Sequence, residues 1–324
     1  MTLVGMCAQF CPKREVDERT RNRQLDPLFE REVVFKRYTR SAAGRSAEKP
    51  EDVRPPAVLL KTVEYLLGDT VRLADFPRCY PFIWDRLWAV RQDLTLQQSA
   101  CVLTRKILVR CVKFYTVSVV LCSGRDVPLS SFDPKINDTH LVDTLGKLLR
   151  IYEELEIEDE DRPLMESLWL LINLRSSRIV YRAFNLSPEI KSKMKHVLKL
   201  AKTYFSSNNF RFLHSIDELH VLESCLVSKI LNSVRLDLLQ ILNVAFSSRS
   251  CAFPLAVLSD WLNCDESDCE KIVEFCGLPL DGNSRVNFLK THRNCRFIED
   301  QTTLFPNDSR KFAISEDLSS ILLL

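Results

Sequence analysis

Residues Phe82–Gln97 read FIWDRLWAVRQDLTLQ and combine a helical apolar pattern with charged side chains. Four aliphatic residues recur at the spacing of one helical face: Ile83, Leu87, Val90 and Leu94. Trp84 and Trp88, one turn apart, add a second apolar stripe. A helix that is apolar on two sides packs against neighbours on both. The stretch therefore predicts a buried helix in an assembly of helices.

The charges of this stretch need partners if the helix is buried. Arg86 and Asp93 share one helical face, and Asp85 and Arg91 lie near its edge. Because buried charges are almost always paired, we predict a structural ion-pair core of Asp85, Arg86, Arg91 and Asp93, formed among themselves or with neighbouring helices. The alternative is that one of the carboxylates is catalytic.

Composition favours an all-α protein. Glycine is only 7 of 324 residues, and the chain contains no Gly-Gly or Asn-Gly hairpin turn. Helical apolar spacing recurs over residues 58–67, 80–92, 95–122, 138–158, 163–184, 188–206 and 216–247. Short connections and no alternating strands predict antiparallel helix pairs stacked as a helical-repeat solenoid, of the TPR-like or PCI type, without a repeated sequence motif.

The pattern changes near residue 247. Pro254–Leu262 and Asp265–Cys276 are two short helical patterns, and residues 278–289 read as a β-hairpin with Gly282 in its turn. Two helices followed by a small hairpin predict a C-terminal winged helix that caps the solenoid. We therefore expect an N-terminal arm and linker over 1–57, a helical-repeat domain over 58–246, and a winged helix with a tail over 247–324.

Basic clusters are the candidates for nucleic-acid contact. Residues 247–324 carry 8 basic and 12 acidic groups, and the second short helix is strongly acidic, which disfavours its entry into a DNA groove. A basic strip follows it at Arg285, Lys290, Arg293 and Arg296. A second cluster lies on one helical face at Arg175, Arg178 and Arg182, and a third is the series Lys191, Lys193, Lys195, Lys199 and Lys202. Each can instead be a solvated surface, partly neutralised by the acidic run 153–161.

Catalysis, metal binding and membrane insertion find little support. The 12 cysteines include no Cys-x-x-Cys pair, Cys264, Cys269 and Cys276 lack a neighbouring His pair, and the role of Cys7 and Cys11 stays open. No Gly-x-Ser-x-Gly, His-Glu-x-x-His or phosphate loop occurs. No apolar run is long enough for a bilayer, and the start does not read as a secretory signal. We expect an intracellular, reduced, non-enzymatic protein without a cofactor, metal or small-molecule substrate.

Several ordered blocks resemble the Sac/GANP family, the scaffold proteins of TREX-two-type mRNA-export complexes. Within the opening stretch they are Asp85-Arg86, Arg91-Gln92-Asp93 and Gln97. Elsewhere they are Gly5-Met6-Cys7, Cys11-Pro12, residues 52–56 with Leu59 to Leu66, residues 210–212, Cys225-Leu226, Arg235, residues 253–255 and residues 275–278. The resemblance implies a PCI-like scaffold that pairs through its winged helix with a PCI-domain protein, together with a small acidic DSS-one-like peptide and RNA.

Several positions depart from the family pattern, among them Ser167-Leu168-Trp169, which stands in place of a Phe-Arg-Ala-Tyr type segment. Trp84 and Trp88 stand where polar or basic residues are commoner, and Tyr115 stands where many members have His. The chain is most similar to the short Sac-three-domain-containing members, some of which are associated with centrosomes and spindles. We therefore expect a scaffold in mRNA export or nuclear RNA processing, located in nucleus and cytoplasm. The alternatives are a scaffold in centrosome duplication and spindle assembly, and an RNA-binding protein that uses the winged-helix basic strip.

Overall fold

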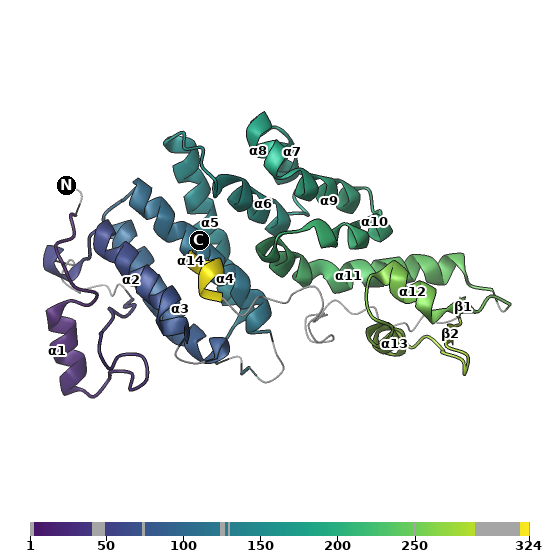
Figure 1. Cartoon of the computed structure of the whole chain (residues 1–324), viewed down its shortest axis with the longest axis horizontal. Coiled ribbons are helices and arrows are strands. Elements are labelled where there is room, and N and C mark those ends of the chain that lie inside the picture. Colours follow the sequence, from purple (N-terminus) through teal and green to yellow (C-terminus); the bar gives the residue numbers. More distant parts are fainter. Residues whose placement is uncertain are drawn as a thin grey trace. The chain divides into compact units, whose positions relative to one another are not determined.

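A computed structural model describes residues 3–40, 49–72, 75–123, 127–128, 130–248, 250–288 and 318–323. Over these residues the chain is built from α-helices and one small antiparallel sheet of two strands (Figure 1). The prediction of an all-α helical protein is confirmed. The chain divides into two compact units, Met1–Met165 with Ile314–Leu324, and Glu166–Ala313.

The first unit is a layered helical assembly. Its elements are α1 (Lys13–Arg21), α2 (Pro56–Gly68), α3 (Phe76–Leu96), α4 (Val102–Leu121), α5 (Pro134–Glu154) and α14 (Leu318–Leu323), with 3-10 turns at Pro50–Asp52 and Thr70–Arg72. Helices α2, α3 and α4 pack against one another, and α5 lies along α4. Most of α4 is buried, which places it at the centre of this unit.

Helix α3 contains residues 82–96 of the FIWDRLWAVRQDLTLQ stretch, and Gln97 caps its end. It begins after Asp75 with a proline in its first turn, and it ends at Leu96, before Gln98 adopts a positive φ of 46°. The helix predicted over residues 95–122 was therefore wrong at its start. In the structure, five residues separate the end of α3 from the start of α4 at Val102. Pro81 lies inside α3 and removes one helical hydrogen bond without ending the helix.

Residues near the two ends of the chain belong to the core of the first unit. Phe10 and Phe35 stack with ring centroids 5.6 Å apart, and Phe35 is completely buried. Phe10 and Phe35 thus pack within the range that was expected to be an arm and linker. At the other end, Leu322 of α14 is buried and the Arg72 guanidinium donates a hydrogen bond of 2.8 Å to Ser319 Oγ. Residues 318–323 therefore pack on the first unit.

The second unit continues with shorter helices. They are α6 (Arg162–Ile172), α7 (Ser177–Phe184), α8 (Pro188–Lys193), α9 (Lys195–Phe205), α10 (Asn209–His214) and α11 (Val221–Ala245), with a 3-10 turn at Ile216–Glu218. The boundary between the two units lies within α6, at Glu166. The helical patterns expected over 163–184 and 188–206 each divide into two helices, because the chain turns after Ile172 and at Met194. The start of α11 has a capping box between His220 and Glu223.

The last part of the second unit contains β1 (Phe253–Pro254), α12 (Leu255–Leu262), α13 (Glu266–Phe275) and β2 (Arg285–Val286). Phe253 pairs with Val286, and Leu280 forms an antiparallel bridge to Val286, so the expected hairpin closes onto β1. The Arg235 guanidinium of α11 donates hydrogen bonds of 2.9 Å to the Leu262 carbonyl and 2.7 Å to the Asn263 carbonyl, which anchors the end of α12. These elements have the order expected for a winged helix; the assignment itself, and the three-domain division at 57 and 246, stay predictions.

Candidate functional site

Asp93 of α3 is the centre of a buried charge cluster. Its carboxylate accepts 2.8 Å from Lys36 Nζ and 2.7 Å from Arg54 Nε, and neither Asp93 nor Arg54 has any exposed surface. The Arg54 backbone N–H also donates to Asp93 at 3.3 Å. Both cations come from the segment that composition described as an arm. Asp93 therefore fixes residues 36 and 54 onto α3, which is a structural role.

Gln97 extends this cluster by one helical turn. Its amide donates 2.9 Å hydrogen bonds to the carbonyls of Arg54 and Asp93, and its Oε1 accepts 3.0 Å from the Gly5 N–H. A Cβ on Gly5 would lie 2.6 Å from the Val53 carbonyl oxygen and 2.9 Å from Arg54 carbon, both backbone atoms. Sequence blocks that are far apart along the chain thus meet at one point.

We predict that Gly5→Ala destabilises the protein by about 1–3 kcal/mol, the usual cost of forcing an extra methyl group into a packed site. Urea unfolding measures the change. Gly282→Ala is the matched control, because a Cβ there meets no atom within 4 Å. Equal unfolding free energies for the two variants would contradict the close approach at Gly5.

Arg86 belongs to a second buried cluster on α3. Its guanidinium lies 3.1 Å from Glu30 Oε1 and 2.9 Å from Asp85 Oδ2, and Glu30 also pairs with Arg19 of α1. Glu30 accepts further hydrogen bonds from the backbone N–H groups of Asp26 and Phe35. Burial alone would raise the pKa of Glu30, but the Arg19 hydrogen bond and the Arg86 charge lower it overall. The four predicted core residues thus divide among separate clusters.

Arg91 contacts neutral groups. Its Nη1 donates to His140 Nδ1 at 2.6 Å and to the Tyr115 hydroxyl at 3.4 Å. Burial, followed by the Arg91 charge, lowers the pKa of His140 to about 4. The rings of Trp84 and Trp88 lie edge-on to the His140 ring, with centroids 4.9 and 4.6 Å away. The Tyr115 ring lies 5.8 Å from the same histidine ring, so three of the residues expected to depart from the family pattern gather around His140.

We predict a pH dependence of stability from His140. Its folded pKa is below the unfolded value of 6.5, so the unfolded state binds more protons between pH 6.5 and 4. The histidine contribution is complete above pH 6.5 and is lost as the pH falls towards 4. In urea unfolding series, His140→Gln should show a smaller loss of stability over this range than the unsubstituted protein. Parallel pH profiles for the two proteins would refute the assignment.

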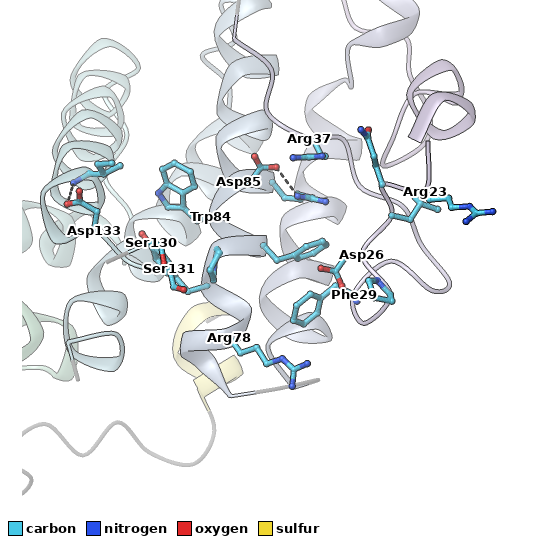
Figure 2. A pocket seen from close by; sticks show the side chains of 18 residues that line it. Arg23, Asp26, Phe29, Arg37, Arg78, Trp84, Asp85, Ser130, Ser131 and Asp133 are labelled. Carbon is cyan, nitrogen blue, oxygen red and sulfur yellow. Dashed lines mark hydrogen bonds and ion pairs between the residues drawn. The ribbon is translucent and has the colours of Figure 1, made fainter. Parts of the chain in front are cut away.

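A groove of about 790 Å³ opens beside these clusters in the first unit (Figure 2). It lies between residues 23–37, the first half of α3 and residues 130–136. Figure 2 shows Trp84, Ser130 and Ser131 on one side and Asp26 and Phe29 on the other. The lining includes the aromatic rings of Phe29, Tyr80, Phe82 and Trp84 and the guanidinium groups of Arg23, Arg37, Arg78 and Arg86.

The carboxylates of the groove are held by local hydrogen bonds. Asp26 Oδ1 accepts from the backbone N–H groups of Leu28 and Phe29 at 2.8 and 3.0 Å, and Asp133 Oδ1 caps the start of α5. Asp85 is bound to Arg86. An apolar floor with a rim of fixed charges suits a peptide segment of mixed polarity. The groove is our candidate protein-binding site.

The predicted nucleic-acid residues fall in different places. Arg285 is exposed on β2, where its backbone N–H donates to Asp281 Oδ1 at 2.9 Å. Lys290, Arg293 and Arg296 lie outside the described residues. A basic strip along residues 285–296 therefore stays a prediction.

The second basic cluster lies around α7. Arg182 forms an ion pair of 2.6 Å with buried Glu166, which makes it a structural residue. Arg178 is exposed. Arg175 hydrogen-bonds to Tyr204, and this contact raises the pKa of the arginine. The three arginines predicted to share one helical face therefore differ: Arg182 and Arg175 bond to other residues of the protein, whereas Arg178 is exposed to solvent.

Neither a metal-binding cluster nor a membrane-spanning helix occurs in the described ranges of the chain. There, no group of three His, Cys, Asp or Glu side chains is placed to hold a metal ion. Cys7 and Cys11 are buried free thiols, and burial raises the pKa of Cys11. The same ranges contain no helix long and apolar enough to cross a membrane.

Sequence reasoning missed the partners of the α3 charges. Lys36, Arg54 and Glu30 come from segments without helical periodicity, so no spacing rule connects them to Asp93 or Arg86. The groove was also missed, since its arginines come from separate elements. The sequence offered one signal for these partners. Arg54 immediately precedes the helix start at Pro55-Pro56, which could have placed its side chain beside the neighbouring helices.

Comparison with known proteins agrees with the ordered blocks. A family model described as the SAC3/GANP family matches residues 10–282. The chain is 24% identical to Protein xmas of Drosophila melanogaster over 318 residues, covering 89% of this chain and 15% of that protein. SAC3 family protein B of Arabidopsis thaliana is 24% identical over 307 residues, covering 86% of this chain and 18% of that protein.

A third relative is SAC3 family protein 1 of Schizosaccharomyces pombe, 24% identical over 329 residues, covering 90% of this chain and 32% of that protein. The chain thus spans less than a third of the length of these three relatives. The family model covers most of the chain, including every helix from α1 to α13. On this match, and with the Asp93 and Gln97 contacts joining its sequence blocks, the chain belongs to the SAC3/GANP family.

Proposed function

We propose that this protein is a non-catalytic interaction scaffold that acts in mRNA export or nuclear RNA processing, in the nucleus and cytoplasm. The observation that carries the proposal is the SAC3/GANP family match over residues 10–282. The ion pairs of α3 support it. Asp93 and Arg86 form salt bridges within the protein and so have a structural rather than a catalytic role. Such a helix holds a fold together and presents surfaces to partners.

The partner that we propose is a PCI-domain protein, bound through the C-terminal module of β1, α12, α13 and β2. Helix α13 offers an acidic exposed face at Glu266, Glu270 and Glu274, spaced four residues apart. An exposed single-sign face favours docking on a basic surface and selects against acidic ones. A small acidic DSS-one-like peptide is the proposed third component. The groove beside Trp84 would take a peptide segment from one of these partners.

Affinity purification of the tagged chain from nuclear extract, with and without RNase, tests the proposal by mass spectrometry. A PCI-domain protein should be recovered in both samples, because a scaffold holds its partner through protein contacts. Recovery of that protein only in the untreated sample would assign the association to RNA. Its absence from both samples would remove the proposed pairing.

A scaffold in centrosome duplication and spindle assembly is the second candidate. It is favoured by the gathering of Trp84, Trp88 and Tyr115 around His140, since these residues depart together from the family pattern at one place. Trp84 lines the groove, so a changed side chain at this position would change the choice of partner. Imaging of the tagged protein through mitosis tests this role, and absence from spindle poles and spindle would exclude it.

RNA binding as the primary activity is the third candidate, through the strip of Arg285, Lys290, Arg293 and Arg296. Exposed Arg285 on β2 is the described residue that supports it. Neutralising the four residues should reduce affinity and weaken its salt dependence. Unchanged affinity would remove the strip as a binding site.

A further inference from the structure

A second cavity of the first unit, about 300 Å³ in volume, is lined mainly by α3 and α5. Arg91 lines it from α3, and Asp143 and Lys147 line it from α5. It has no lining residue in common with the groove beside Trp84. The cavity therefore brings together two cations from two helices of the same unit.

Arg91 is a half-buried cation without a carboxylate partner. Both of its hydrogen bonds use Nη1, and both acceptors, His140 Nδ1 and the Tyr115 hydroxyl, are neutral groups. Over the described residues, Nε and Nη2 of Arg91 bind no protein group, and unlike Nε of Arg86 they are not enclosed. Because charges removed from water are almost always paired, this accessible edge of the guanidinium lacks the anion that such a position requires.

Lys147 is a second half-buried cation at the same cavity. Its Nζ donates to the neutral Thr95 Oγ1 at 3.2 Å. Burial, followed by the charges of Arg91 and Arg150, lowers the pKa of Lys147. The two cations lining the cavity therefore repel each other. Asp143 is exposed and, within the described part of the chain, forms an ion pair with neither of them, so it compensates this repulsion only in part.

Apolar side chains form the remaining wall of the cavity. The rings of Tyr38 and Trp88 stack with their centroids 3.6 Å apart, and Leu96 and Leu108 line the same space. An apolar wall with a few convergent polar groups is typical of a ligand site, and this volume lies at the lower end for such sites. The cavity therefore suits the end of a chain better than a segment that must enter and leave.

We propose that this cavity binds the C-terminal carboxylate of a partner peptide, with an apolar last side chain against the rings of Tyr38 and Trp88. The Nε and Nη2 edge of Arg91 donates to both carboxylate oxygens, and Lys147 supplies the second positive charge. This site deepens the proposed scaffold function and rests on it for its biological setting.

Charge and shape distinguish this occupant from other anions. Arg91, Lys147 and Asp143 together carry a charge of +1, which one carboxylate neutralises. A phosphate monoester carries nearly two negative charges at neutral pH and would be repelled by Asp143. An internal acidic residue or a phosphodiester would need room for the chain on both sides of the anion.

The purified full chain and the fluorescein-labelled peptide Gly-Ser-Gly-Ser-Leu test the site by fluorescence anisotropy. The peptide with a free C-terminus should bind about 10- to 100-fold more tightly than its C-terminal amide, because the amide removes the charge that Arg91 and Lys147 require. Neither inorganic phosphate nor the amidated peptide Gly-Ser-Asp-Ser-Leu, whose acid is internal, should displace it.

Two substitutions of opposite sign test the residues that line the cavity. Lys147→Gln should weaken binding of the free-acid peptide about tenfold. Asp143→Asn removes a repulsion and should strengthen binding by up to about fivefold. Lys135→Gln, at an exposed lysine in the first turn of the same helix, is the matched control and should bind as the unsubstituted chain does. Circular dichroism checks that each variant keeps the fold.

Several results would overturn the site. They are no binding of the free-acid peptide, equal affinities for acid and amide, displacement by phosphate or by the internal acid, and equal affinities of Lys147→Gln and Lys135→Gln. Purified chain and synthetic peptide contain no PCI-domain protein. Failure here therefore leaves the partner purification intact, and failure of that purification leaves this result intact.

Discussion

The substitution Asp93→Asn is expected to lower the free energy of unfolding by about 3–5 kcal/mol, the usual cost of removing one partner from a buried ion pair. The neutral amide would leave Lys36 and Arg54 without their counter-charge in a site from which water is excluded. Arg54 already has one buried N–H group, at Nη2, without a hydrogen-bond partner, so the site has little capacity to compensate. Urea unfolding monitored by circular dichroism measures the loss.

Asp75→Asn is the matched control for this prediction, because Asp75 is exposed at the start of the same helix and its side chain makes no capping hydrogen bond. We expect it to change stability by less than about 1 kcal/mol. A double-mutant cycle with Lys36→Met sharpens the test, since Lys36→Met should cost less in the Asp93→Asn background. Strictly additive effects would show that the two side chains do not interact.

Glu30→Gln is expected to have the next largest effect, also about 3–5 kcal/mol. Glu30 is fully buried and accepts from Arg19, Arg86 and two backbone N–H groups. A glutamine side chain would turn an N–H₂ donor towards at least one of these donors. The exposed neighbour Glu32 provides the control substitution Glu32→Gln, which should leave stability nearly unchanged.

The same carboxylate gives a pH signature. The pKa of Glu30 is lowered in the folded state, so its stabilisation is complete above the unfolded pKa and is lost as the pH falls through the folded value. Unsubstituted protein should therefore lose more stability in acid than Glu30→Gln does. Equal losses of unfolding free energy on acidification in the two proteins would contradict the assignment.

Helical periodicity identified the class of the fold and the burial of α3, because a regular apolar stripe depends only on local geometry. It could not place breaks such as that at Met194, where the apolar spacing continues across two short helices. The buried contacts of the N-terminal segment were not visible in the sequence for a related reason. Its buried Arg19, Glu30 and Lys36 look like surface residues until their partners are known.

For the candidate sites too, the sequence indicated local patterns but not the contacts between distant segments. Sequence reasoning placed Asp85, Arg86, Arg91 and Asp93 in an ion-pair core. It could not identify Glu30, Lys36 or Arg54 as partners, since long-range pairing has no periodic signal, and it did not foresee that Arg91 bonds His140 and Tyr115. The basic clusters of α7 and α9 were visible as charge patterns. The exposure of their side chains became evident only once burial was known.

The scaffold function is tested most directly by the amount of PCI-domain protein that copurifies with the chain after RNase treatment, measured by quantitative mass spectrometry. Unsubstituted chain should retain the partner, and the α13 variant Glu266→Lys/Glu270→Lys/Glu274→Lys should lose most of it. Glu154→Lys/Glu156→Lys/Glu158→Lys, on exposed residues of the first unit, is the charge-matched control and should retain it. An unsubstituted chain that recovers no PCI-domain protein would contradict the account.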